Sequence, residues 1–533
     1  MMAANMLPSL LDGDRGGLLL RLVVNGICQA ATAAGLAFLV EGALRAANAP
    51  AHDRDALLTL GLLAAGGMTV VLLRALQRRD AEALGLSYVH DIRVRVFAHV
   101  CTVPSQTRGA ALGPMIARLT NDLLGVKNWI SYGVSAVAVA AICILSLLLV
   151  MAATDVRLAI ATAAAVALVL TFVAIMSSPL NASVRVARSE RGKLASALAN
   201  RIASRAAIVA FARVEIEARK VGALSKQLKK SLTRRGWLGG LVRYSADAVV
   251  PLAILSLAIT VAVTPRPSVP NGEGNAIAWL FLLGVVLGQL QDLTRATDYW
   301  VGYRPAIERL ERVFALPVLP KGSSEGAFTE RDAPVVTFMG FQVDPDVADD
   351  EITAARVRVL DLGSSAAPVR RAVFLQLARI GVGIRHDIQL GGRSLEQVPE
   401  ADYRRLIAAS SEDLPLLRGT VGGNLKKSRG RDVDDARRDE ILALTGLVKG
   451  GARVAELLAT TIEDLSPSLA GRVRLARALL RAPRILVIDE EVLAHDRAVM
   501  AALAADCRRT RTALILCMAS SESAAELAGD RSY

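Results

Sequence analysis

The chain has 533 residues, 53% of them hydrophobic, and a formal net charge of +13 at pH 7. Its mean hydropathy is +0.40, which is too apolar for a soluble protein of this length and argues against a soluble enzyme. The positive charge could attract nucleic acid, but aromatic residues make up only 4% of the chain and no DNA- or RNA-binding motif is present. A membrane protein whose loops carry the positive charge is the better hypothesis, and the length allows two or three domains.

Neither the cysteines nor the N-terminus marks a secreted protein. The five cysteines show no CxxC or metal-ligand spacing, so we interpret them as isolated thiols that need no oxidising compartment. The N-terminus has no signal peptide with a small-residue cleavage site, so the first apolar run is expected to stay in the chain as an anchor.

Six long apolar runs fill the first 300 residues. Most of them approach the ~20 residues with which a helix crosses ~30 Å of hydrocarbon. A single run could be a buried helix of a soluble domain, but six in succession predict six membrane-spanning helices. The predicted spans are residues 22–40, 56–73, 134–153, 158–176, 248–264 and 276–293.

The segments between the runs alternate between short and long. The short ones carry four Lys and Arg residues in total, whereas the N-terminal segment and the two long ones, 74–133 and 177–240, carry 24. The positive-inside rule therefore places the long segments and the N-terminus in the cytoplasm. The long segments also show helix-period apolar positions, and helices rising ~1.5 Å per residue would extend them ~40 Å from the membrane as stalks.

A linker follows the sixth run, and a different kind of domain follows the linker. Residues 318–334 are rich in Gly, Ser, Pro and charged residues. Beyond them, strand-like and helix-like pieces alternate, as in an α/β domain. We therefore predict a transmembrane domain over residues 1–317, a linker over 318–334 and an α/β domain over 335–533.

Residues 465–496 carry the clearest pattern of the second domain. A helix-like run ends before Pro483, a four-residue apolar strand follows over 485–488, and Asp489 and Glu490 come directly after it. Ligands of open α/β sheets bind at the carboxyl ends of the strands. One carboxylate could hold Mg²⁺ while the other orients an attacking water. Strand-end carboxylates also cap helices or pair with Arg, so a structural role is the alternative.

The order of these parts resembles the signature-to-Walker-B block of ATP-binding cassette (ABC) exporters, whose pattern is LSGGQ, LARALL, four apolar residues, DE and a SALD-type D-loop. Leu465 and Ser466 match the signature, residues 475–480 read LARALL, Asp489 and Glu490 match DE, and Asp496 closes the D-loop. Three stretches before the linker resemble the membrane domain of the same family: residues 116–122 (IARLTND), 210–215 and 306–314.

The resemblance implies a half-transporter with an all-α six-helix transmembrane domain and long cytoplasmic helical extensions, followed by an α/β P-loop-NTPase-like domain. It also implies ATP and Mg²⁺ as cofactors, with Glu490 as the catalytic residue and Asp489 as the Mg²⁺ ligand. The nucleotide-binding positions that it implies are Gly363, Ser364, Ser365, Ser466 and Asp496.

Other positions depart from the family pattern and predict a degenerate nucleotide-binding domain. Pro368 stands where the P-loop has the glycine before its Lys, and Val369 stands in the Lys position. Proline removes a backbone N–H donor, and Arg370 and Arg371 replace a hydroxyl pair and cannot ligate Mg²⁺. These arginines could contact phosphate, but a solvated helix face is the simpler interpretation. The Q-loop, signature and switch positions hold Glu412, Pro467-Ser468-Leu469 and Met518, and the domain is expected to be trimmed at its C-terminal end.

The sequence is therefore compatible with two functions of different classes. The first is a subunit of an ABC exporter-type transporter that is impaired in its own ATP binding and hydrolysis and is paired with a second subunit. The second is a non-hydrolysing membrane scaffold or regulator derived from such an exporter. A fully active ATPase would need Arg370 or Arg371 to replace the missing Lys, so the assignment as an enzyme stays open.

The expected partners are the lipid membrane and another ABC half-transporter, in a homo- or heterodimer with the heterodimer favoured; nucleic acid is not expected. We expect the inner (plasma) membrane of a bacterium, with the N-terminus and the nucleotide-binding domain in the cytoplasm. Asn25 and Gln29 lie one helical turn apart on the first span. They could line a substrate pathway or hydrogen-bond to neighbouring helices.

Overall fold

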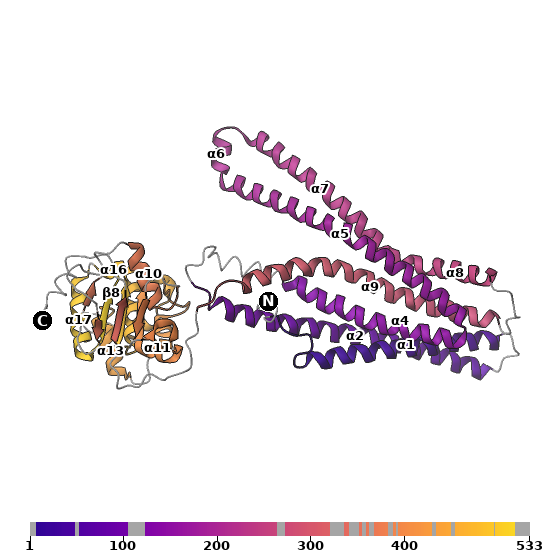
Figure 1. The fold of residues 1–533 in the computed structure, drawn as a ribbon, viewed down its shortest axis with the longest axis horizontal. Coiled ribbons are helices and arrows are strands. Elements are labelled where there is room, and N and C mark those ends of the chain that lie inside the picture. Colours follow the sequence, from indigo (N-terminus) through magenta and orange to yellow (C-terminus); the bar gives the residue numbers. More distant parts are fainter. Residues whose placement is uncertain are drawn as a thin grey trace. The chain divides into compact units, whose positions relative to one another are not determined.

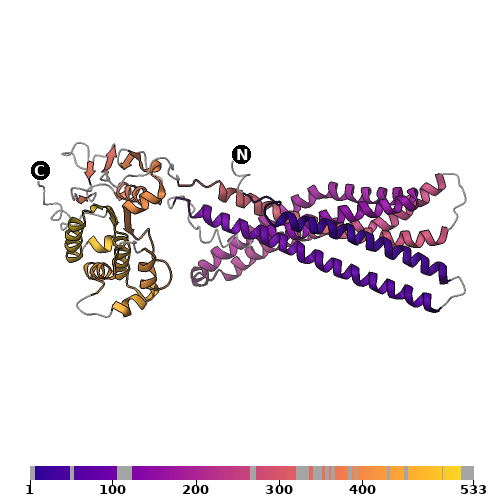
Figure 2. The ribbon, with the colours of Figure 1, turned by 90° about the horizontal axis from the view of Figure 1, so that it is seen from below.

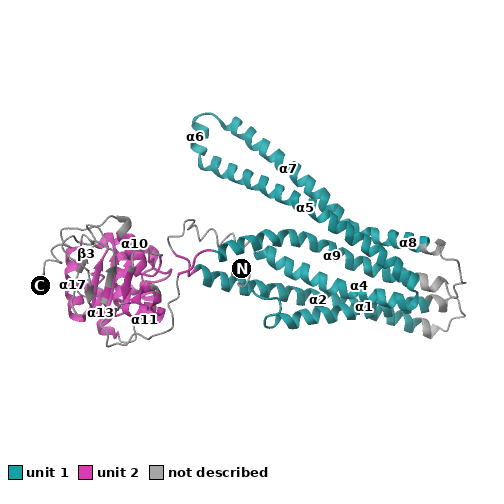
Figure 3. Cartoon of the chain, viewed as in Figure 1, with its two compact units in different colours: residues 1–100, 111–315 teal, residues 101–110, 316–533 magenta. Residues whose placement is uncertain are grey.

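The structure is a computed structural model of the chain. It describes residues 7–47, 53–104, 123–263, 272–319, 335–339, 351–353, 359–361, 367–381, 387–390, 393–428, 433–448, 454–494 and 496–517. The chain forms two compact units, which are coloured separately in Figure 3. Unit 1 comprises residues 1–100 and 111–315, and unit 2 comprises residues 101–110 and 316–533.

Within the residues that the structure describes, unit 1 is helical, and six of its helical segments are long and apolar enough to cross a membrane. The prediction of an all-α six-helix membrane domain is thereby confirmed. Helices suit this environment because hydrocarbon offers no partner for an unpaired backbone N–H or C=O group. The helices are α1 (Arg15–Ala47), α2 (Asp53–Val100), η2 (Trp129–Val134), α4 (Ser135–Thr154), α5 (Val156–Ala203), α6 (Arg205–Ala210), α7 (Val214–Tyr244), η3 (Ser245–Ala248), α8 (Val249–Val263) and α9 (Gly272–Phe314).

Small residues allow α1 to lie close to α4. Gly26 of α1 faces the backbone of Val139, and a Cβ added at Gly26 would lie 3.1 Å from the Val139 carbonyl oxygen. Ala30, Ala33 and Ala37 continue the same face of α1 and are buried. Without a hydrophobic driving force between helices in lipid, close packing of small residues is a main source of helix association.

Helices α5 and α7 form a long hairpin whose tip is the short helix α6 (Figures 1 and 2). The side chain of Asp155 caps the start of α5 by accepting a hydrogen bond from the backbone N–H of Arg157. Close to the tip, Arg201 of α5 pairs with Glu217 of α7 at 2.7 Å. The long segment 177–240 is thus helical over most of its length, as its apolar periodicity predicts.

Unit 2 is an α/β domain whose parallel sheet has the strand order β3-β8-β7-β6. Alternate residues of β7 belong to two separate hydrophobic clusters: Leu486 and Ile488 pack with α15 and α17, and Ile485 and Val487 pack with α10. All four side chains are fully buried, as expected for a central strand that is covered by helices on both faces. The parallel strands are β3 (Val359–Asp361), β6 (Ile407–Ser411), β7 (Ile485–Asp489) and β8 (Ala513–Leu516).

A second, antiparallel sheet of unit 2 has the order β2-β1-β4-β5 and was not predicted. Its strands are β1 (Val335–Met339), β2 (Glu351–Thr353), β4 (Asp387–Leu390) and β5 (Arg393–Ser394). The helices of unit 2 are α10 (Ala367–Leu377), η4 (Leu395–Gln397), α11 (Glu400–Leu406), α12 (Val421–Ser428), α13 (Asp435–Leu444), α14 (Val454–Ala459), η5 (Ile462–Asp464), α15 (Pro467–Leu479), α16 (Glu491–Ala494) and α17 (Arg497–Thr510). The α/β architecture predicted for this part of the chain is confirmed.

Candidate functional site

The carboxyl end of the parallel sheet brings the predicted acidic residues together with the start of α10. Strand β7 ends at Asp489, which lies directly opposite Ser411 at the end of the neighbouring strand β6. The apolar run Ile485–Ile488 fixes this position, because its four buried side chains leave the next residue at the sheet edge. This edge is where ligands of open α/β sheets bind.

Asp489 is partly buried, and its environment favours the protonated form. Burial, together with the nearby carboxylates of Asp413 and Glu491, raises the pKa of Asp489 to about 6. Arg371 and Arg370 act in the opposite direction without cancelling it. A carboxyl group that holds a proton near pH 6 is a poor ligand for a divalent cation at that pH.

Glu490 points into the protein and is fully buried. Arg474 of α15 donates two hydrogen bonds to it, from Nε to Oε1 and from Nη2 to Oε2, both at 2.7 Å. Ser410 of β6 donates a third from its hydroxyl to Oε1 at 2.9 Å. The ion pair also raises the pKa of Arg474, which is itself only 8% exposed. Both carboxylate oxygens are therefore occupied by groups of the chain itself.

The first turn of α10 carries Arg370 and Arg371, at the positions where the family has hydroxyl residues. The guanidinium of Arg371 donates a hydrogen bond to Asp413 Oδ1 at 2.9 Å. Its side chain is 65% exposed, which agrees with the interpretation as a solvated helix face. Arg370 and Arg371 nevertheless place positive charge beside the carboxyl end of the sheet. A Mg²⁺ ion bound there would need acidic and hydroxyl oxygens instead.

Ser466, a predicted nucleotide-binding residue, acts as the N-cap of α15. Its hydroxyl oxygen accepts a hydrogen bond from the backbone N–H of Leu469 at 3.3 Å, and Pro467 occupies the first helical turn. Proline is favoured there because the missing N–H has no helical partner in any case. This cap explains why α15 starts at Pro467.

Asp496, the predicted D-loop residue, is the N-cap of α17 and also pairs with α15. Its Oδ1 accepts a hydrogen bond from the backbone N–H of Val499 at 3.2 Å, and its Oδ2 pairs with Arg472 at 2.6 Å. These bonds tie the start of α17 to the middle of α15, so the Asp496 carboxylate already has a structural role.

Three predicted nucleotide-binding residues, Gly363, Ser364 and Ser365, lie outside the described residues, as does Met518 at the switch position. Of the predicted set, the structure therefore places four residues. Asp489 lies at the sheet edge, Glu490 lies in a buried ion pair, and Ser466 and Asp496 cap two helices.

The placed residues do not fit Mg²⁺-nucleotide chemistry. Glu490 is fully buried and already accepts three hydrogen bonds from Arg474 and Ser410, so it is not presented to a water as a general base. Over the part of the chain that the structure describes, no group of three or more His, Cys, Asp and Glu side chains is arranged to hold a metal ion. We therefore derive no hydrolytic step for this chain.

The sequence does not single out Arg474, the residue that holds the Glu490 carboxylate in a buried ion pair. It lies in α15 between Val473 and Leu475, both fully buried. A charged residue in the middle of a buried apolar run needs a partner, because burying an unpaired charge is costly. That signal predicts a buried acidic partner but does not identify which of the nearby carboxylates it is.

The polar residues of the first membrane helix join three helices together. Gln29 donates to Asn25 Oδ1 and to Gln77 Oε1 of α2, both at 2.7 Å, and Gln289 of α9 donates to Gln29 Oε1 at 3.1 Å. Asn25 also donates to the Leu73 carbonyl oxygen at 2.9 Å. Of the two hypotheses for Asn25 and Gln29, these contacts favour hydrogen bonding between helices.

Residues 18–264 match the family model of the ABC transporter transmembrane region. Over 322 residues the chain is 26% identical to the ATP-dependent lipid A-core flippase of Ralstonia nicotianae, covering 56% of this chain and 53% of that protein. It is 27% identical over 305 residues to the flippase of the same name from Cupriavidus metallidurans, covering 53% of this chain and 50% of that protein. It is also 32% identical over 178 residues to an Fe(3+) ions import ATP-binding protein of Streptomyces avermitilis, covering 32% of this chain and 47% of that protein.

The chain thus spans about half the length of these curated relatives. Among solved structures it is similar to a bacterial Atm1-family ABC exporter with ATP bound, with a TM-score of 0.72 and 17% sequence identity. That similarity covers 95% of this chain and 91% of the other, and at this identity it shows a shared fold.

Proposed function

Since the chain belongs to the ABC exporters through its transmembrane region and has their half-transporter fold, we propose that it is a transporter subunit impaired in its own ATP binding and hydrolysis. In such exporters, each nucleotide site joins the P-loop of one chain to the signature of another. A chain with a failed site of its own can therefore still serve in a dimer.

One observation carries the proposal. Glu490, at the position of the family's catalytic glutamate, is held in a buried bidentate ion pair by Arg474. In a low-dielectric interior such a pair is costly to break, because either ion left alone would be buried without a counter-charge. The glutamate is kept in the sequence, but its carboxylate serves the packing of α15 against the sheet.

The sequence of the P-loop region supports the same conclusion. Pro368 and Val369 stand in place of the glycine and the Lys, and Arg371 pairs with Asp413. A phosphate cradle needs a Lys and a run of backbone N–H donors, and proline supplies no such donor.

We propose a heterodimer as the working assembly, with an intact half-transporter as the second subunit. The partner would then supply the nucleotide cradle and the catalytic base of at least one site. The proposed location is the inner membrane of a bacterium, with the N-terminus and the nucleotide-binding domain in the cytoplasm, because the basic residues gather in the N-terminal and long segments.

The second candidate is a non-hydrolysing scaffold or regulator derived from an exporter. The roles of Ser466 and Asp496 favour it: both are helix caps, and Asp496 also pairs with Arg472. If neither residue is available to a nucleotide, the site that this chain would share with a partner is impaired as well.

Labelled-ATP crosslinking distinguishes these functions. The full chain is tested alone and together with a candidate half-transporter partner. The subunit hypothesis predicts labelling of the partner in the complex and substrate-stimulated ATPase activity of the complex. The scaffold hypothesis predicts no such activity. Vanadate-sensitive turnover by the chain alone would contradict both.

A further inference from the structure

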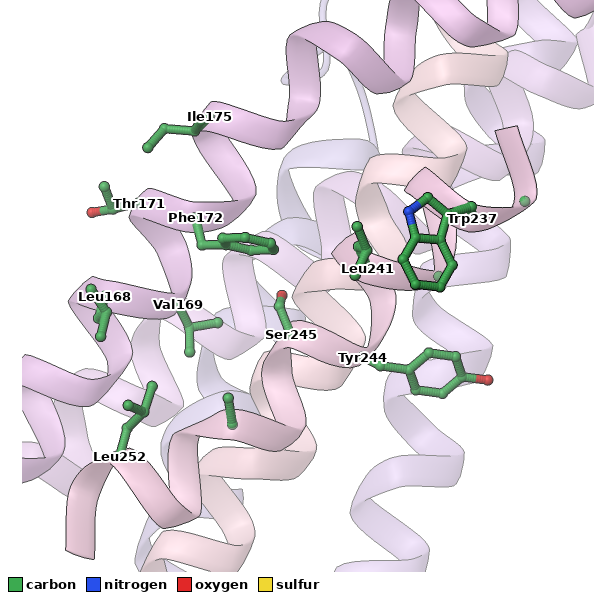
Figure 4. Close-up of a pocket in the computed structure, with 13 residues that line it drawn as sticks. Leu168, Val169, Thr171, Phe172, Ile175, Trp237, Leu241, Tyr244, Ser245 and Leu252 are labelled. Carbon is green, nitrogen blue, oxygen red and sulfur yellow. The ribbon is translucent and has the colours of Figure 1, made fainter. Parts of the chain in front are cut away.

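Figure 4 shows an apolar groove between α5 and α7 of unit 1. Its walls are membrane helices on which we expect the second subunit of the proposed dimer to pack, so the groove of a single chain does not identify a ligand. A surface that does not depend on that contact lies on unit 2, at the amino ends of its parallel strands.

Three neighbouring strands of the parallel sheet are each preceded by an arginine. Arg405 lies two residues before β6, Arg484 lies directly before β7, and Arg511 lies two residues before β8. Backbone hydrogen bonds of 2.8 Å hold these segments side by side, because the N–H of Arg484 donates to Leu406 and its carbonyl oxygen accepts from Ala513. Neighbouring strands lie about 4.8 Å apart, so the three arginines form a row about 10 Å wide. We call this row the arginine edge.

The charges of the arginine edge are not balanced by the chain itself. Arg405, Arg484 and Arg511 are exposed, and over the part of the chain that the structure describes none of the three guanidinium groups has a hydrogen-bond or ion-pair partner. Further positive charge lies beside them. Arg481 donates to the carbonyl oxygen of Arg404 at 2.6 Å, and burial and the charge of Arg404 lower the pKa of Arg481. Cations held together repel one another, so an anion bound at this edge would relieve that repulsion.

Arg511 stands at a position that favours glycine. It follows α17 directly and has a φ of 55° and a ψ of 41°, in the left-handed region. Glycine is the usual residue after a helix in this conformation, because a Cβ makes the conformation unfavourable. An arginine at this position carries a conformational cost, and such a cost points to a role for the side chain.

We propose that the arginine edge binds an extended segment of a partner protein that is rich in aspartate and glutamate. A guanidinium group pairs with a carboxylate through two parallel hydrogen bonds. In an extended chain, alternate side chains point the same way and lie about 7 Å apart, so successive carboxylates can reach different arginines of the row. A single small anion is too narrow to bridge three strands. The edge lies at the opposite end of β7 from Asp489, so this proposal does not depend on the proposed impairment in ATP use.

Two other polyanions fit the arginine edge less well. Single-stranded nucleic acid binds by stacking its bases on aromatic side chains, and the three residues before each of β6, β7 and β8 include none. A flat anionic membrane would also meet the carboxylates of Glu400 and Glu440, which pair with Arg404 and Arg509 beside the edge. A narrow segment needs to contact only the unpaired arginines.

Fluorescence anisotropy on the full chain in phosphatidylcholine nanodiscs tests the proposal. The probe is a short fluorescein-labelled peptide of alternating Glu and Ser, and the matched peptide has Gln in place of every Glu. We expect the Gln peptide to bind roughly ten-fold more weakly, because it forms no ion pairs. Binding of the Glu peptide will also weaken as salt is added, since exposed charges are screened. Equal binding of the two peptides would overturn the proposal.

Paired variants locate the site. Arg484→Gln with Arg511→Gly removes two charges of the edge, and the glycine relieves the left-handed position, so this variant is expected to fold. It will weaken binding of the Glu peptide by roughly ten-fold. The matched control, Arg418→Gln with Arg497→Gln, removes two exposed arginines elsewhere on unit 2; Arg497 lies about 20 Å from Arg511 along α17. The control will change the affinity less than about two-fold. Native-level binding in the first variant, or an equal loss in the control, would contradict the assignment.

Competition identifies the class of the occupant. Unlabelled Glu peptide, phosphatidylglycerol vesicles and short single-stranded DNA are each added to the chain with its labelled peptide, at matched concentrations of negative charge. We expect the Glu peptide to displace the probe at the lowest concentration. Displacement by the vesicles or the DNA at a lower concentration would show a membrane- or nucleic-acid-binding surface and would overturn the proposal.

Discussion

At the scale of single residues, the contact between Glu490 and Arg474 has the largest consequences. The two residues are 0% and 8% exposed and share two hydrogen bonds of 2.7 Å. Buried pairs of this kind contribute little net stability compared with apolar residues, but each partner depends strongly on the other. The pair therefore acts as a structural unit of the α/β domain.

We predict that Arg474→Met destabilises unit 2 by about 3–5 kcal/mol, because it leaves the Glu490 carboxylate buried without a counter-charge. Adding Glu490→Leu to that variant will restore most of the loss. Thermal unfolding of the purified chain is monitored by the susceptibility of unit 2 to proteolysis. This measurement is made on the single and the double variant. Arg371→Gln removes an exposed pair with Asp413 and serves as the control, with a loss of less than about 1 kcal/mol. Equal effects of Arg474→Met and Arg371→Gln would contradict the assignment.

Asp489 gives a prediction about pH. Its pKa is raised to about 6 in the folded chain, whereas an aspartate in an unfolded chain titrates near about 4. Between these values the folded chain holds a proton that the unfolded chain has released. The contribution of Asp489 to stability is therefore present below about pH 4 and is lost as the pH rises through about 6.

Asp489→Asn removes this loss. We expect it to raise the free energy of unfolding of unit 2 by about 1–2 kcal/mol at pH 7.5, after allowance for partial exposure, and to have little effect at pH 4. Denaturation of the native and variant chains at both pH values measures the difference. A stabilisation that is the same at the two values would show that Asp489 is not the titrating group.

The sequence allows Asp489 and Glu490 to be placed at a sheet edge, because the apolar run before them has the length and composition of a buried strand. It does not predict that one carboxylate stays at the edge while the other turns inward. That difference depends on Arg474 and Ser410, which come from α15 and β6 and meet Glu490 only after the sheet has formed.

At the scale of elements, the packing of α1 against α4 depends on Gly26. A Cβ there would lie 3.1 Å from the carbonyl oxygen of Val139, closer than ordinary contact. We predict that Gly26→Val separates the two helices and destabilises unit 1 by about 1–3 kcal/mol. The matched control is Gly35→Val on the same helix, where a Cβ meets no atom within 4 Å. Thermal unfolding in detergent compares the two, and equal losses would contradict the close contact.

The length and composition of the apolar runs are sufficient to predict six spanning helices, and the structure confirms that number of membrane-length helices. The i, i+4 spacing also places Asn25 and Gln29 on one face, and the structure shows them bonded to each other. Their partners Gln77 and Gln289 come from α2 and α9. Which helices lie beside α1 is a property of tertiary packing, so no local pattern identifies these partners.

The antiparallel sheet of unit 2 illustrates the same limit. Its strands have two to five residues, too few to establish a period-2 pattern, and β1 pairs with β4 about 50 residues further along the chain. The parallel strands β7 and β8 are continuous apolar runs between helices, and their sequence alone predicts them well.

At the scale of the whole molecule, the chain is an integral membrane protein that is similar to ABC exporters in its transmembrane region and in its fold. The membrane unit matches the family model over residues 18–264. In the α/β unit, the signature, strand-end and D-loop positions still follow one another along the sequence in the order typical of the family. However, Glu490, Ser466 and Asp496 make contacts within the chain itself. Our account is that the fold has been kept while the nucleotide site has lost its chemistry.

The central claim is that this chain does not bind ATP by itself, and photo-crosslinking with labelled ATP tests it most directly. The full chain in lipid vesicles is irradiated with azido-ATP and Mg²⁺, with excess unlabelled ATP as the competitor. An ATP-dependent lipid A-core flippase treated in the same way is the positive control. We predict no labelling of the chain that unlabelled ATP can compete away. Competable labelling at the level of the flippase, together with vanadate-sensitive turnover, would contradict the account.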